Sequence, residues 1–174
     1  TDPDDYTDST SEGNTTYYVS FSSGDDANDG KTETTPFKNL GKINSITFKA
    51  GDIVKFKKGD TWKGYFKIRG SGSEGSHISV DSYGSGNLPI IDGNGYQAGI
   101  FLENIENITI SNIEITNEAT HRKSDGSVKL MHSSDRNGQD ERYGILVLRF
   151  GDGRNISNIN INNVKISNIY PTPG

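Results

Sequence analysis

Residues 118 to 142 carry two of the three histidines and ten charged residues, five of each sign. Imidazole, carboxylate and cationic side chains together supply a proton acceptor, a proton donor and a group that neutralises a carboxylate, which are the roles needed for acid–base catalysis. Loops are the usual carriers of such residues, and a polar loop with unpaired charges is the equal alternative. The candidate catalytic residues are His121, Arg122, Lys123, His132, Asp135, Arg136, Asp140, Glu141 and Arg142.

Two further groups of residues could bind a ligand. Trp62 is the sole tryptophan; it could stack on a sugar ring, and packing near a cap is the alternative. The second group resembles half of a calcium-binding loop and consists of Asp25, Asp26, Asn28 and Asp29. However, Ala27 stands at the third ligand position and Pro36 at the twelfth, so a turn rich in Asp and Asn is the alternative. Calcium is therefore the single cofactor that the sequence suggests.

A sequence repeat on both sides of the insertion indicates the strands that position these residues. The phrase ENITISNIEITN at residues 106–117 returns as SNININNVKISN at residues 157–168, aligned without a gap so that Asn117 falls over Asn168. In both copies β-branched aliphatic residues recur at every second position, which is the period of a strand with one buried face. The phase slips at Asn112 and Asn163, where Asn suits a bend because it tolerates left-handed backbone angles.

The repeat predicts an all-β fold, a right-handed parallel β-helix in which three strands per turn stack on the turn before. Stacked asparagines are expected to form hydrogen-bonded ladders. Upstream, residues 99–102 resemble residues 144–147 at an offset of 45. Apolar residues three apart between Phe37 and Ile46 predict a short helix that caps the N-terminal end.

These patterns divide the chain into a tether and a solenoid. Residues 1–16 hold five acidic and no basic residues, which predicts an acidic, disordered N-terminal tether. Residues 17–174 form the parallel β-helix, with an N-terminal cap at 17–50, coils at 51–174 and an inserted loop at 118–142. We expect the chain to end mid-solenoid.

Composition narrows the class of protein. The 174 residues are 30% hydrophobic with a mean hydropathy of −0.69, which is lean for a two-layer core and sufficient for a thin solenoid. A net charge of −5 argues against a nucleic-acid partner. The sequence contains no apolar run of about 20 residues that could span a membrane, and no cysteine for disulfides.

Short motifs between residues 17 and 93 occur in a recognisable order. They are Tyr17-Tyr-Val-Ser, Pro36-Phe-Lys, Ala50-Gly-Asp-Ile-Val-Lys-Phe56, Gly59-Asp-Thr-Trp62 and Pro89-Ile-Ile-Asp-Gly93. This region resembles the N-terminal part of secreted right-handed parallel β-helix carbohydrate-active enzymes of the pectate-lyase-like superfamily. The resemblance implies a secreted or cell-surface bacterial protein whose polysaccharide substrate lies across the outer groove of the coils. It also implies a further partner, the C-terminal remainder of the β-helix, in the same or a separate chain.

Two classes of function remain open. The first is the N-terminal part of an extracellular polysaccharide-degrading enzyme. A polysaccharide lyase would remove the proton next to a uronate carboxylate and stabilise the developing charge with a cation. A glycoside hydrolase would use two carboxylates roughly 5 to 10 Å apart, for which Asp135, Asp140 and Glu141 are the clustered candidates. The second class is a non-catalytic glycan-binding or surface-adhesion solenoid.

Overall fold

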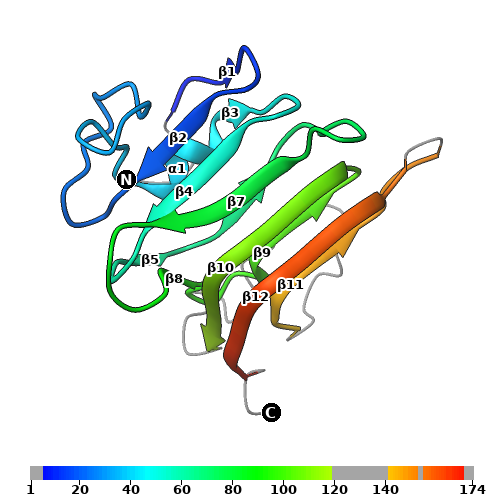
Figure 1. Cartoon of the computed structure of the whole chain (residues 1–174). Coiled ribbons are helices and arrows are strands. Elements are labelled where there is room, and N and C mark those ends of the chain that lie inside the picture. The colour runs from blue at the N-terminus through cyan, green and yellow to red at the C-terminus, as the bar shows by residue number, and fades with distance from the viewer. Residues whose placement is uncertain (1–5, 119–140, 153–154, 171–174) are drawn as a thin grey trace.

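The computed structural model describes residues 6–118, 141–152 and 155–170. Within these residues the chain is all-β apart from one short helix, α1 (Leu40–Asn44) (Figure 1). The strands are β1 (Ser9–Thr10), β2 (Thr16–Val19), β3 (Ile46–Thr47), β4 (Ile53–Lys57), β5 (Thr61–Lys63), β6 (Phe66–Ile68), β7 (Ile78–Tyr83), β8 (Ile90–Asp92), β9 (Ala98–Glu103), β10 (Glu106–Glu118), β11 (Tyr143–Leu148) and β12 (Ser157–Tyr170).

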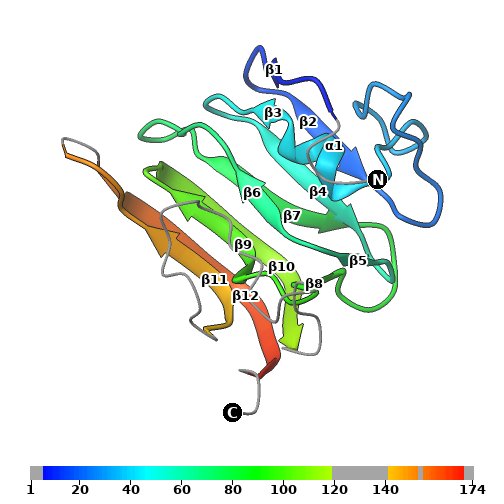
Figure 2. The same ribbon diagram turned by 180° about the vertical axis from the view of Figure 1, so that it is seen from behind.

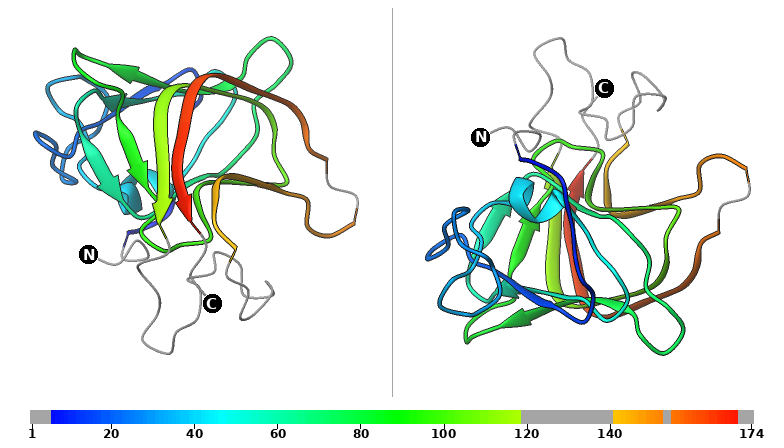
Figure 3. Two further views of the ribbon diagram at one scale, coloured as in Figure 1. Left: turned by 90° about the horizontal axis from the view of Figure 1, so that it is seen from below. Right: turned by 90° about the horizontal axis from the view of Figure 1, so that it is seen from above.

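All pairs between these strands are parallel. The largest sheet has the order β2-β4-β7-β10-β8-β5, with β12 added on β10, and a second sheet has the order β11-β9-β6. Each pass of the chain therefore lies beside the previous one (Figure 1, Figure 2). Viewed along a perpendicular direction, the passes surround a common interior (Figure 3).

The strand registers confirm both repeats. Ile108 pairs with Ile159 and Ile113 with Val164, at the offset of 51. Ile100 pairs with Ile145 at the offset of 45. The inward-facing aliphatic positions of β10 are fully buried, because alternate side chains of a strand point to opposite faces and one face here is the interior.

The last aligned pair was predicted wrongly. The register shifts between Ile115 and Asn117, so that Asn117 pairs with Ile169 and not with Asn168. Asn168 has a φ of 53°, and the extra residue on β12 forms the irregularity of a β-bulge. Asn117 is fully buried instead, which gives it a different role from the corner asparagines.

The asparagine ladders form at the bends. Asn158 Nδ2 donates to Asn107 Oδ1 at 2.9 Å, and Asn163 Nδ2 donates to Asn112 Oδ1 at 2.7 Å. Asn112 in turn donates to the Asp81 carboxylate at 2.7 Å. The bends of successive passes are thus joined by side-chain hydrogen bonds along the stack.

The helix is shorter than the apolar spacing predicted. It is confined to Leu40–Asn44, because Phe37 N donates to Tyr18 O and Ser20 N donates to Phe37 O. These bonds hold Phe37 as an extended partner of β2, which removes the first predicted turn. No helix in the described part of the chain is long and apolar enough to cross a membrane.

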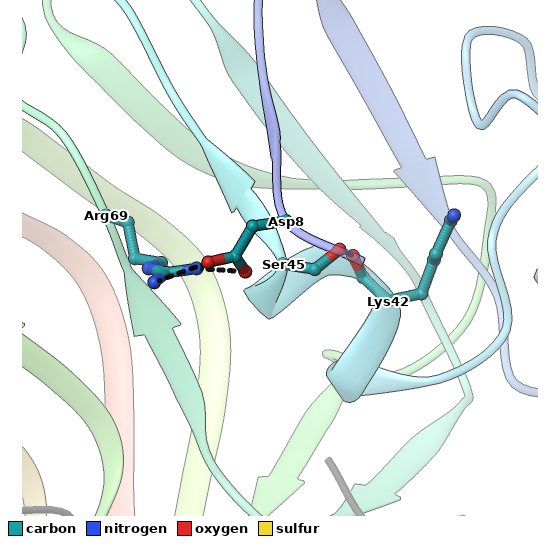
Figure 4. A network of polar contacts seen from close by, with 4 residues as sticks. All are labelled: Asp8, Lys42, Ser45 and Arg69. Atoms are coloured by element: carbon teal, nitrogen blue, oxygen red, sulfur yellow. Dashed lines mark hydrogen bonds and ion pairs between the residues drawn. The ribbon is translucent and has the colours of Figure 1, made fainter. Parts of the chain in front are cut away.

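The N-terminal segment from Tyr6 onwards differs from the predicted tether. β1 pairs with β3, and Ser11 is 3% exposed. The Arg69 guanidinium binds the Asp8 carboxylate through two hydrogen bonds of 2.6 and 3.1 Å (Figure 4). Asp8 therefore has a partner on the folded body, which composition alone did not show. Residues 1–5 of the predicted tether lie outside the described residues.

Candidate functional site

Most of the predicted catalytic residues lie outside the part of the chain that the structure describes. These are His121, Arg122, Lys123, His132, Asp135, Arg136 and Asp140. Glu141 and Arg142 are described, immediately before β11. Glu141 Oε2 accepts a hydrogen bond of 2.9 Å from the Tyr143 hydroxyl. Arg142 is 7% exposed and donates from Nη1 to the Glu141 carbonyl at 3.0 Å.

Both ends of the insertion are held at one corner of the stack. Asn117 Nδ2 donates to the carbonyl of Tyr96 at 2.8 Å and to the carbonyl of Tyr143 at 3.2 Å. Tyr143 N donates to Gln97 O at 2.8 Å. The residue before the insertion and the residue after it are therefore both bound to the turn between β8 and β9.

Gly93 allows this arrangement. A Cβ atom on Gly93 would overlap the side-chain amide of Asn117. Gly93 N also donates to Thr116 O at 2.7 Å, so the backbone of this turn cannot withdraw without losing a hydrogen bond. A glycine is needed here for close approach, and the buried amide of Asn117 occupies the space.

A groove of about 230 Å³ lies at the same corner of the stack. We call it the corner groove, and its principal lining side chains are Tyr6, Phe21, Asn39, Tyr65, Asn94 and Tyr96. Tyr65 and Tyr96 follow β5 and β8, and their rings meet edge to face with centroids 4.8 Å apart. Because Tyr96 also accepts the Asn117 hydrogen bond through its carbonyl, the groove and the root of the insertion share a wall.

Asp26 holds two residues that line the corner groove, Tyr6 and Asn39. Its carboxylate accepts hydrogen bonds from the Tyr6 hydroxyl at 2.7 Å, from Asn39 N at 3.0 Å and from Asn39 Nδ2 at 2.6 Å. Lys38 N adds a fourth at 2.8 Å. Partial burial acts to raise the pKa of Asp26, but the hydrogen bonds from Asn39, Tyr6 and Lys38 outweigh it and lower the pKa below its usual value. The carboxylate is therefore ionised at neutral pH and fixes Tyr6 and Asn39.

Of the four predicted calcium ligands, Asp26 binds Tyr6, Lys38 and Asn39 as described above, and the other three make hydrogen bonds within their own loop. Asp25 accepts from Ala27 N, and Asp29 accepts from Lys31 N and the Thr35 hydroxyl. Asn28 Nδ2 donates to Pro36 O. Among the described residues no group of three or more His, Asp or Glu side chains could hold a metal ion. This geometry favours the alternative of a turn rich in Asp and Asn, and calcium binding stays a prediction.

Trp62 is in the core and is not a platform for a sugar. The side chain is 2% exposed, and Nε1 donates to Lys38 O at 2.9 Å. Its ring packs edge to face against Phe56 with centroids 5.1 Å apart. The packing alternative is the one that the structure shows, because a buried ring offers no face to a sugar.

Sequence reasoning missed the tyrosines of the corner groove. Tyr65 and Tyr96 each follow a glycine, as Gly64-Tyr65 and Gly95-Tyr96. Both glycines have positive φ, and Gly64 N donates to Asp92 O, which joins the two turns. A repeated Gly-Tyr pair after two short strands was the available signal.

The stacked parallel passes are consistent with a β-helix-like solenoid. No protein-family model matches the chain. The chain is 33% identical, over 137 residues, to a lacto-N-biosidase of Bifidobacterium longum subsp. longum, an alignment that covers 63% of this chain and 9% of that protein.

Two solved structures share the fold. They are the selenomethionine and native forms of the GH136 lacto-N-biosidase from Eubacterium ramulus. Each has a TM-score of 0.65 and 23% sequence identity, and covers about 90% of this chain. The chain spans 28% of the solved relatives and 9% of the curated one.

Proposed function

We propose that the chain forms the N-terminal windings of a right-handed parallel β-helix in a glycoside hydrolase, with α1 covering the N-terminal end. The observation that carries the proposal is the combined likeness to lacto-N-biosidases, 33% identity to one and a shared fold with another. The parallel passes and the 51-residue register support the β-helix. Export to the cell surface or medium is part of the proposal.

The reaction we propose is hydrolysis of a glycosidic bond in a glycan that contains lacto-N-biose. Such a reaction needs a carboxylic acid that protonates the leaving oxygen and a second carboxylate that acts as nucleophile or base. In this chain the candidates stay Asp135, Asp140 and Glu141, of which Glu141 is described and accepts a hydrogen bond from the Tyr143 hydroxyl. Further windings of the whole protein are proposed to complete the site.

The second candidate is glycan binding without turnover, and the corner groove is the observation that favours it. Its aromatic rings and amides can hold a sugar without supplying an acid and a base. A lyase stays a weaker proposal, because the relatives are named as glycosidases.

The test incubates the protein with a lacto-N-biose-terminated oligosaccharide, pectin and alginate. Reducing ends and the ultraviolet absorbance of unsaturated products are followed together. An increase in reducing ends alone, on the first substrate, is the expected result. An increase in both signals would identify a lyase and contradict the proposal, and binding with neither signal would leave the non-catalytic solenoid.

A further inference from the structure

We propose that the corner groove is a subsite for one uncharged sugar ring, with Phe21 as its aromatic contact and Asn39 and Asn94 as its hydrogen-bonding groups. The inference rests on the proposed function for the class of ligand. None of the described residues that line the groove is one of the predicted catalytic residues.

The aromatic contact is an exposed ring in a groove that Trp62 also lines. Phe21 is 49% exposed, and the Lys38 ammonium lies over its ring at 5.7 Å from the centroid. Trp62 is fixed in place by its hydrogen bond to Lys38 O. A flat apolar ring at the surface suits the C–H face of a pyranose, because aromatic side chains bury a large apolar area with defined geometry.

The hydrogen-bonding groups are held in fixed positions. Asn39 Nδ2 is bound to Asp26, so the orientation of the amide is set. Asn94 has a φ of 46°, and its N–H donates to Asp92 Oδ1 at 3.0 Å, which closes the turn beneath it. An amide offers both an acceptor and donors, and this matches a sugar hydroxyl, which is itself a donor and an acceptor.

Size and charge define the ligand further. A groove of about 230 Å³ is smaller than the roughly 300 to 1,000 Å³ of sites for drug-sized molecules, which favours a single ring. The described lining residues include no acidic side chain and no arginine, and Lys63 is their one cation. The ammonium groups of Lys38 and Lys42 lie over the rings of Phe21 and Tyr6, 5.7 and 5.9 Å from the ring centroids. A uronate carboxylate is best bound by an arginine fork, so an uncharged sugar fits these side chains better.

The experiment measures binding of lacto-N-biose and of a digalacturonate by saturation-transfer NMR at millimolar concentrations. Phe21→Ala removes the exposed ring, and Asn94→Asp keeps a residue that tolerates positive φ while removing the amide donor. We expect lacto-N-biose to bind the unsubstituted protein and its affinity to fall roughly tenfold in Phe21→Ala and several-fold in Asn94→Asp. Tyr170→Ala is the matched control, since Tyr170 is a 56% exposed aromatic on β12, and it should bind as the unsubstituted protein does.

Circular dichroism verifies that each variant is folded. If one of the two groove variants is misfolded, the other still tests the inference by itself. Unchanged affinity in a folded groove variant, absence of binding to the unsubstituted protein, or tighter binding of the digalacturonate would overturn the inference. If the unsubstituted protein produces no reducing ends but binds lacto-N-biose, and the groove variants weaken this binding, the hydrolase proposal is rejected and the subsite proposal is retained.

Discussion

At the scale of residues, asparagine shapes the bends of this protein. Every non-glycine residue with a positive φ among the described residues is an asparagine. Asn107, Asn112, Asn158 and Asn163 use this conformation at the bends and also join the passes through their amides. Asparagine combines both roles, since its side chain tolerates the left-handed region and carries a donor and an acceptor.

The double role of Asn112 can be separated with two variants. Asn112→Gly removes the hydrogen bonds to Asp81 and from Asn163, and glycine adopts the φ of 55° without strain. Asn112→Ala removes the same hydrogen bonds and also places at this φ a side chain that does not tolerate it. We expect Asn112→Ala to lower the free energy of unfolding by about 2 kcal/mol and Asn112→Gly by about 1 kcal/mol. Urea unfolding measures both, and equal losses would show that backbone strain does not contribute.

Gly93 and Asn117 form a pair that should be coupled. Gly93→Ala brings a Cβ into the Asn117 amide, and we expect a loss of about 1 to 3 kcal/mol from overpacking. Asn117→Ala makes room but leaves the Tyr96 and Tyr143 carbonyls without their shared donor. The double variant should therefore lose less than the sum of the two single losses in a denaturant-based double-mutant cycle. Additive losses would contradict the close approach.

At the scale of elements, the N-terminal segment is attached to the body by carboxylates. Hydrogen bonding to Arg69 lowers the pKa of Asp8 against a smaller opposing effect of burial. The pKa of Asp26 is also lowered, and its partner Tyr6 lies on the same segment. The two lowered carboxyl pKa values mean that ionised Asp8 and Asp26 contribute to holding the segment, beside the pairing of β1 with β3.

As the pH is lowered, the N-terminal segment should detach at a higher pH than the one at which the stacked strands unfold. A carboxyl group whose pKa is lower in the folded state contributes stability above its unfolded pKa of about 4, and that contribution is lost as the pH falls through the folded value. We expect proteolysis near β1 to increase below about pH 4 while the far-ultraviolet dichroism is retained. Asp26→Asn should raise proteolysis at neutral pH and weaken its pH dependence, and an unchanged profile would contradict this account.

At the scale of the whole molecule, the passes of the chain differ in burial although they repeat in sequence. Ile110 and Ile115 of β10 are fully buried. Their register partners on β12, Ile161 and Ile166, are 48% and 49% exposed. In a stacked fold each pass is stabilised by its neighbours, so the same residue contributes differently according to its place in the stack.

The repeat supplies its own control for this effect. We expect Ile110→Ala to lower the free energy of unfolding by about 2 to 5 kcal/mol, as is usual for buried aliphatic residues. Ile161→Ala should cost less than about 1 kcal/mol in the same chain. Urea unfolding of the two variants gives the comparison, and hydrogen exchange should find β7 and β10 better protected than β12. Equal costs would mean that β12 is covered in solution.

The stacking of the passes could be predicted from the sequence because it follows from local rules. Alternating aliphatic residues place Ile108 and Ile113 inside, and the left-handed tolerance of asparagine places the bends at Asn112 and Asn163. Once the period of the repeat is known, the parallel register at an offset of 51 follows.

The candidate site was decided by the tertiary structure. Tyr65 and Tyr96 are 31 positions apart in the sequence, and their rings meet because the turns that contain Gly64 and Gly95 lie side by side, joined by the hydrogen bond from Gly64 N to Asp92 O. In the sequence Asn117 resembles the asparagines at the bends. In the structure it is buried, and its side-chain amide donates hydrogen bonds to the carbonyls of Tyr96 and Tyr143, next to the two ends of the insertion. Backbone preferences act on neighbouring residues and can be read from sequence, whereas contacts between bends depend on how many residues each pass contains and on what the core leaves exposed.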